Sequence, residues 1–186
     1  MVTEILPARK VKDTQAQPIT VSPLDEVAET IREDALALAQ ERLSVPLRGL
    51  ELKRLLRRSE FIDNLKYGLA RGISNTLSAH DSRVMAVYAF DPSTNPDSDA
   101  VEEIPIDPTV HLLVVVQSPS AALDAFIASL DRTLTASLNE LPSPKFEQRT
   151  SILDVNILTE EDVKQGRGYA VLLSSVFAPP LQVWQR

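Results

Sequence analysis

The stretch Val110 to Gln117, VHLLVVVQ, is followed at once by Ser118-Pro119-Ser120 and then by a long segment of helical periodicity. Its five consecutive aliphatic residues, 112–116, predict a strand that is buried on both faces. The Ser-Pro-Ser sequence predicts a helix start, with a hydroxyl cap and proline at the first helical position. A central strand that leads directly into a helix indicates an α+β or α/β domain.

The composition narrows the class of protein. The chain has 186 residues, of which 44% are hydrophobic and 24% charged, as in globular proteins and unlike disordered or fibrous ones. A net charge of −7 argues against nucleic-acid binding through overall charge. The chain contains no cysteine, which excludes disulfides and thiol chemistry. Without a membrane-length apolar run or a signal-peptide core, we expect a cytoplasmic protein.

Three regions follow one another along the chain. Residues 1–23 are rich in proline and polar residues, which predicts an extended or disordered arm, or one that lies on a partner. Residues 24–59 predict a helical extension, with one helix over 24–43 and another from about 47 to 59. Residues 60–186 predict an α+β domain in which helices flank a small mixed sheet.

Hydrophobic periodicity and turn residues divide this domain into elements. In chain order they are a helix over 61–77, strands near 83–90 and 110–117, a helix over 123–141, a strand near 150–158, a short helix from Thr159 to Gly166, a helix over 169–177 and an extended piece over 181–184. Residues 91–108 form an acidic, proline-containing connection that is longer than hairpin loops, so we expect it to be functional or mobile.

A basic cluster stands out in this acidic chain. Arg54, Arg57 and Arg58 lie close together in the predicted helix over 48–58, with Arg48 and Lys53 nearby. Such a cluster suggests phosphate or nucleic-acid binding, but no aromatic residues are interleaved to stack on bases. A solvated face, or a surface that meets an acidic partner, is the commoner cause of such a run.

The order strand, long loop, strand, helix, strand, together with the wording of the strands, resembles nucleotidyltransferase domains of the DNA polymerase β type, particularly the minimal nucleotidyltransferases. AVYAF (86–90) is similar to the strand before the family's Gly-Ser turn, and HLLVVV (111–116) to the strand that carries its Asp-x-Asp pair. SILDVNILTEEDV (151–163) is similar to the strand that bears the third carboxylate. The resemblance covers residues 57–180.

That resemblance implies a two-metal site, which the residues of this chain do not reproduce. The Gly-Ser turn would bind the triphosphate, and three carboxylates would hold two Mg²⁺ ions and activate the acceptor hydroxyl. Asp91 and Pro92 stand at the Gly-Ser positions, and Thr109 and His111 at those of the Asp pair. Only Asp154 falls on a carboxylate position of the family.

A single carboxylate cannot assemble two-metal chemistry, so we expect a degenerate site in which His111 is a hydrogen-bonded structural residue. Asp107, if the register slipped, or Asp97 and Asp99 of the acidic loop would be needed to restore a metal site. The two histidines, His80 and His111, are not spaced as a zinc cluster.

These observations lead to one functional expectation and two alternatives. We expect a pseudoenzyme that serves as a binding or structural subunit, or adaptor, of a larger assembly. It would have a protein partner or a second copy of itself, and no cofactor. The first alternative is an atypical Mg²⁺-dependent nucleotidyltransferase that combines acids of the 91–108 loop with Asp154. The second is nucleic-acid binding through the helix at 48–58.

Overall fold

Helices and strands alternate along the chain in the computed structural model, which describes residues 23–44, 50–90, 107–143, 146, 149–176 and 178–186. Its elements are α1 (Pro23–Leu43), α2 (Leu50–Leu55), α3 (Ser59–His80), β1 (Val84–Phe90), β2 (Val110–Val116), α4 (Ala121–Asn139), β3 (Leu153–Thr159), α5 (Glu160–Gln165), the 3-10 helix η1 (Gly168–Ser174) and β4 (Leu181–Gln185). None of the helices in these ranges is both long and apolar enough to cross a membrane.

The strands form one mixed sheet in the order β3-β2-β1-β4. β1 is antiparallel to both β2 and β4, whereas β2 and β3 are parallel. Helix α4 supplies the crossover that a parallel pair requires. The expected α+β class, a small mixed sheet flanked by helices, is therefore confirmed.

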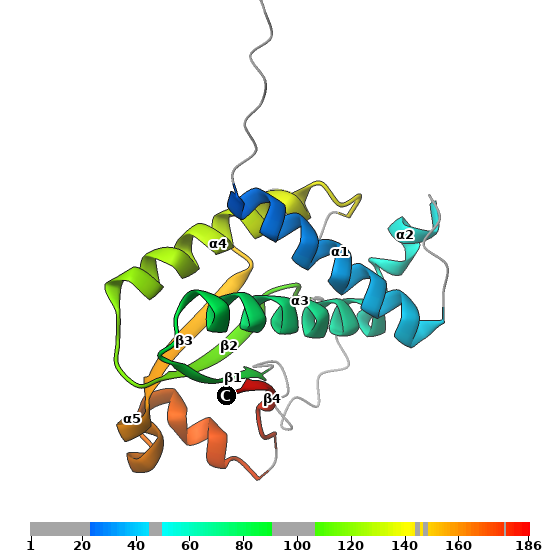
Figure 1. The fold of residues 1–186 in the computed structure, drawn as a ribbon. Coiled ribbons are helices and arrows are strands. Elements are labelled where there is room, and N and C mark those ends of the chain that lie inside the picture. Colours follow the sequence, from blue (N-terminus) through cyan, green and yellow to red (C-terminus); the bar gives the residue numbers. More distant parts are fainter. Residues whose placement is uncertain (1–22, 45–49, 91–106, 144–145, 147–148, 177) are drawn as a thin grey trace, which may run out of the picture.

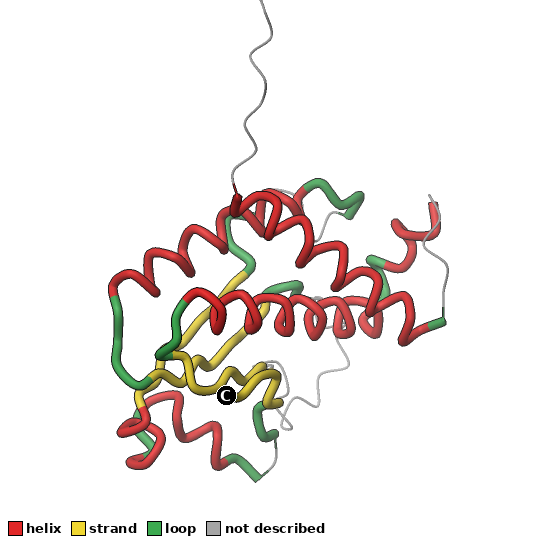
Figure 2. Tube along the Cα trace, in the orientation of Figure 1, coloured by secondary structure: helices red, strands yellow, loops and turns green. Residues whose placement is uncertain are grey.

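The sheet is covered on both faces, as Figures 1 and 2 show. Helices α1, α3 and α4 lie on one side, and α5 with η1 lies on the other. Leu112, Val114 and Val116 of β2 belong to the core under the three long helices, while Leu113 and Val115 belong to a smaller cluster under η1. All five side chains are at most 8% exposed, so the strand is buried on both faces, as its sequence predicted.

The two helices α1 and α3 pack at very short range. Ala28, Ile31, Ala35 and Ala39 form the buried stripe of α1. A Cβ atom built on Gly68 of α3 would lie 2.6 Å from the Cα atom of Ala35. Glycine is needed here because the backbones approach too closely for any side chain. Helix α1 lies in the region that we expected to be a helical extension, and its buried stripe belongs to the core of the domain.

Two elements differ in extent from the prediction. The strand expected near 150–158 begins three residues later, at Leu153, because a carboxylate oxygen of Asp131 in α4 accepts the N–H groups of Ile152 and Leu153, each at 3.0 Å. The helix expected from about 47 to 59 is described only as Leu50–Leu55, and a tighter turn follows it. There the N–H of Arg58 donates to Leu55 O at 2.9 Å.

The start of α4 also corrects the prediction. Ser120 is the cap, and its hydroxyl oxygen accepts the N–H of Leu123 at 3.5 Å. Pro119 therefore precedes the cap and does not occupy the first helical position.

The prediction is only partly correct for the C-terminal elements α5, η1 and β4. The capping box is confirmed, since the hydroxyl of Thr159 accepts the N–H of Asp162 while the Asp162 carboxylate accepts the N–H of Thr159. Gly166 ends that helix with φ 62°, a conformation that favours glycine. The helix expected over 169–177 is instead the 3-10 helix η1, and the extended piece at 181–184 is a fourth strand, β4, paired with β1.

An ion pair between the buried Asp81 and the partly exposed Arg83 fixes the turn between α3 and β1. Asp81 is 8% exposed, and its carboxylate accepts three hydrogen bonds from Arg83, one from the backbone and two from the guanidinium, at 2.6–2.9 Å. The guanidinium bonds and the backbone N–H of Arg83 lower the pKa of Asp81 from 3.8 to about 2, against the opposing effect of burial. The same guanidinium donates to Ser120 at 2.6 Å, which ties this turn to the start of α4.

Replacement of Asp81 by Asn should make the protein less stable in a pH-dependent way. Because the carboxyl pKa is lower in the folded state than in the unfolded one, the stabilisation is present above about pH 4 and lost as the pH falls toward 2. We expect Asp81→Asn to lower the free energy of unfolding by about 1–2 kcal/mol at pH 7 and to flatten its decline below pH 4. Urea unfolding at several pH values measures both effects. The same response in Glu33→Gln, an exposed change on α1, would contradict this account.

The contact at Gly68 predicts a loss of stability on the smallest possible substitution. Alanine at a helical glycine normally stabilises by about 1 kcal/mol, but here the added methyl group collides with backbone, and overpacking costs about 1–3 kcal/mol. We therefore expect Gly68→Ala to lower the melting temperature. Asn75→Ala, at an exposed position of the same helix, should leave it nearly unchanged. A Gly68→Ala protein as stable as the native one would show that α1 and α3 are less closely packed.

Candidate functional site

Strands β2 and β3 bring His111 and Asp154 together. The two residues are register partners in the parallel pair, and His111 Nδ1 lies 2.8 Å from a carboxylate oxygen of Asp154. Since an ionised carboxylate only accepts hydrogen bonds, Nδ1 carries the proton and donates it. The His111 side chain is 12% exposed and that of Asp154 is 51% exposed, so the pair lies at the margin of the core.

Aromatic rings extend the pair across the sheet. The centroid of the His111 ring lies 5.4 Å from that of Phe90 in β1, and Phe90 lies 6.4 Å from Tyr169 of η1. His111 therefore points to the η1 side of the sheet.

Thr109 belongs to a neighbouring turn and not to this pair. Its N–H and its hydroxyl both donate to a carboxylate oxygen of Asp107, at 3.1 and 2.7 Å. Arg149 Nη1 lies 3.3 Å from the same oxygen. Burial raises the pKa of Asp107, but the bonds from Thr109 and the charge of Arg149 outweigh it and leave the pKa below its usual value. Asp107 is thus engaged in holding the entry to β2.

The donor set at this point does not suit a two-metal site. Among the residues that the structure describes, no three His, Asp or Glu side chains converge closely enough to hold a metal ion. Hard cations such as Mg²⁺ prefer oxygen ligands, and imidazole is a poor one for them. Asp91 and Pro92, which occupy the Gly-Ser positions of the resemblance, lie outside the described residues, as do Asp97 and Asp99.

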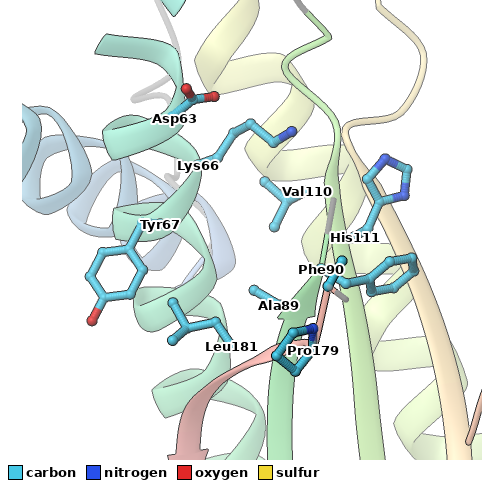
Figure 3. A pocket seen from close by; sticks show the side chains of 10 residues that line it. Asp63, Lys66, Tyr67, Ala89, Phe90, Val110, His111, Pro179 and Leu181 are labelled. Carbon is cyan, nitrogen blue, oxygen red and sulfur yellow. The ribbon is translucent and has the colours of Figure 1, made fainter. Parts of the chain in front are cut away.

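A pocket of about 320 Å³ lies where β1 ends and β2 begins. Figure 3 shows its lining, with the Lys66 side chain extending from α3 toward Val110. Its lining residues are Asp63, Lys66, Tyr67, Ala89, Phe90, Val110, His111, Ala178, Pro179 and Leu181. Of these, only His111 is among the site residues predicted from the sequence. The others come from segments far apart in the chain, and no local pattern marks them.

The basic cluster lies elsewhere. Arg54 is in α2, and Arg57 and Arg58 are in the turn before α3, in the helical layer of the molecule (Figure 1). His111 and Asp154 lie on the other face of the sheet. The structure thus brings together two of the predicted site residues, His111 and Asp154, and places the three arginines on a separate surface.

Comparisons of this chain with protein-family models, curated proteins and solved structures found no match. The resemblance to nucleotidyltransferases therefore remains a prediction from the sequence.

The contact between His111 and Asp154 predicts coupled effects on stability. We expect His111→Ala and Asp154→Ala to destabilise the protein by less in combination than the sum of the single changes. The coupling free energy should be about 0.5–1.5 kcal/mol, because either change alone already breaks the bond. Urea unfolding of the four proteins at pH 7 measures it. Combining Asp154→Ala with His80→Ala, whose ring instead stacks on Phe126, should give additive effects; additivity for His111 as well would contradict the contact.

Proposed function

We propose that this protein is a non-catalytic binding subunit or adaptor, built on a nucleotidyltransferase-like domain whose metal site is replaced by a histidine–carboxylate pair. The observation that carries the proposal is the hydrogen bond between His111 and Asp154. It occupies the place where the resemblance would put carboxylates around metal ions. Asp154 is the one acid at a family position, and its carboxylate is bonded to an imidazole.

The arrangement of the strands supports the nucleotidyltransferase-like part of the proposal. In the resemblance, the strand with the Asp pair and the strand with the third carboxylate work together, so they must be neighbours. The strands with the corresponding positions, β2 and β3, are adjacent, and His111 faces Asp154 in register. A similar order of elements occurs with many functions, so the activity has to be argued from the site itself.

The described acids near the pair support a non-catalytic function. Two-metal catalysis requires ligands that are free to coordinate and are held rigidly in place. Asp107, the described acid that a shifted register would recruit, is bonded by Thr109 and lies beside Arg149. Recruiting it would break the turn that leads into β2.

A nucleotidyl-transfer assay tests the proposal. We expect no transfer from α-labelled ATP to protein or RNA, in Mg²⁺ or Mn²⁺, that depends on Asp154. The physical reason is that one carboxylate cannot position two metal ions. Filter binding and gel autoradiography measure the incorporation. Transfer by the native protein that Asp154→Ala abolishes would overturn the proposal in favour of an atypical transferase.

A gain-of-function variant provides the matched control. Thr109→Asp combined with His111→Asp would restore the acidic pair of the family beside Asp154. If the correspondence of strands is right, this variant should bind Mn²⁺ at least about tenfold more tightly than the native protein, measured by electron paramagnetic resonance. Adding Asp154→Ala to it should reverse the gain. Unchanged Mn²⁺ affinity in a folded variant would contradict the correspondence.

A further inference from the structure

Four positively charged side chains stand together on α2 and the turn that follows it. Lys53, Arg54, Arg57 and Arg58 are all exposed, and we call them the basic surface. All four lie within residues 53–58, the first two in α2 and the other two in the turn before α3. Hydrogen bonds from the N–H groups of residues 57 and 58 to the carbonyls of residues 54 and 55 continue the coil past the end of α2.

The opposite side of this segment anchors it firmly. Leu55 and Leu56 are 6% and 0% exposed, and Phe61 and Ile62 at the start of α3 are fully buried. Leu52 packs partly buried against the same core. The backbone that carries the basic surface is therefore held in place before any partner binds, which reduces the entropy lost on association.

The charges of the basic surface are not neutralised within the described part of the molecule. No described carboxylate forms an ion pair with any of its four members, whereas Arg32, Arg83, Arg149 and Lys164 each have one. Like charges that lie close together repel one another, and this segment places four of them within residues 53–58. A local arrangement that opposes stability, without a visible compensating contact, points to a role in function.

We propose that the basic surface docks an acidic segment of a protein partner, an inference that rests on the proposed function of a binding subunit. Carboxylates complement it in charge, and guanidinium groups bind carboxylates through paired, parallel hydrogen bonds. The chain as a whole has a net charge of −7, so the part outside these four cations is more negative still and repels an acidic partner. That repulsion would direct the partner to this one region.

The same features favour a protein segment over a nucleic acid. Nucleic-acid binding typically uses about 6–10 phosphate contacts, and the basic surface offers four cations. Outside these four cations, the acidic surface of the protein would repel the rest of a long nucleic acid. No aromatic side chain lies within 50–60 to stack on an exposed base, a contact that single-strand binders use.

Titration of the full-length protein with two labelled probes tests this inference. One probe is a fluorescein-labelled peptide of 15 residues rich in Glu and Leu; the other is a labelled single-stranded DNA of similar charge. At 50 mM NaCl we expect the peptide to bind more tightly than the DNA. Arg54→Ala/Arg57→Ala/Arg58→Ala should weaken peptide binding at least about tenfold, because exposed ion pairs are individually weak but act together here.

A charge-matched control separates the surface from overall charge. Arg132→Ala/Lys164→Ala/Arg167→Ala removes three exposed cations outside the basic surface and should leave peptide affinity within twofold. Both variants should melt no lower than the native protein, since the removed side chains are exposed and the buried leucines are untouched. Equal weakening by both variants would overturn the inference, and so would tighter binding of DNA than of peptide, or no peptide binding at 50 mM NaCl.

This test and the transfer assay fail separately. If the protein shows no Asp154-dependent transfer and the basic surface does not bind the peptide, the docking proposal is wrong and the proposal of a non-catalytic subunit still stands. Asp154-dependent transfer would remove the non-catalytic subunit, whatever the peptide does, and with it the premise of the docking surface.

Discussion

Burial of β2 on both faces is the constraint on which the rest of the structure depends. A strand with at most 8% exposure along residues 112–116 requires a complete layer on each side of the sheet. The three long helices provide one layer, and α5 with η1 provides the other. The close approach of α1 and α3 at Gly68 follows from this need, because it lets α1, α3 and α4 share one core above the sheet.

The same constraint determines what a polar residue on β2 can do. His111 is the one polar side chain in β2, and a mostly buried polar group needs a hydrogen-bonding partner. Asp154 provides it from the neighbouring strand, at the half-exposed margin of the sheet. The hydrogen bond between His111 and Asp154 thus meets a requirement of the fold. The exposed cations of the basic surface meet no such requirement among the described residues.

Features that depend on neighbouring residues were predictable from sequence, and features that depend on distant ones were not. The aliphatic run of β2, the periodicity of α3 and the capping box at Thr159 are local and were foreseen. The late start of β3 depends on Asp131, in a different helix. Residues 181–185 form a strand because they pair with β1. The alternation of apolar and polar residues in LQVWQ is too short to predict a strand from sequence. The pocket at the end of β1 gathers residues from four parts of the chain, so no sequence window contains it.

The pairing of β4 with β1 has a consequence for biosynthesis. Strand β1 is synthesised well before β4, so the edge of β1 that pairs with β4 lacks its partner until residues 181–185 have been made. Open edges of this kind are templates for pairing with other chains. In this edge of β1, residues 86–89 are AVYA, which include neither a charged residue nor a proline to discourage such pairing. Until Leu181–Gln185 has been made, this edge of β1 is therefore open to pairing with another chain.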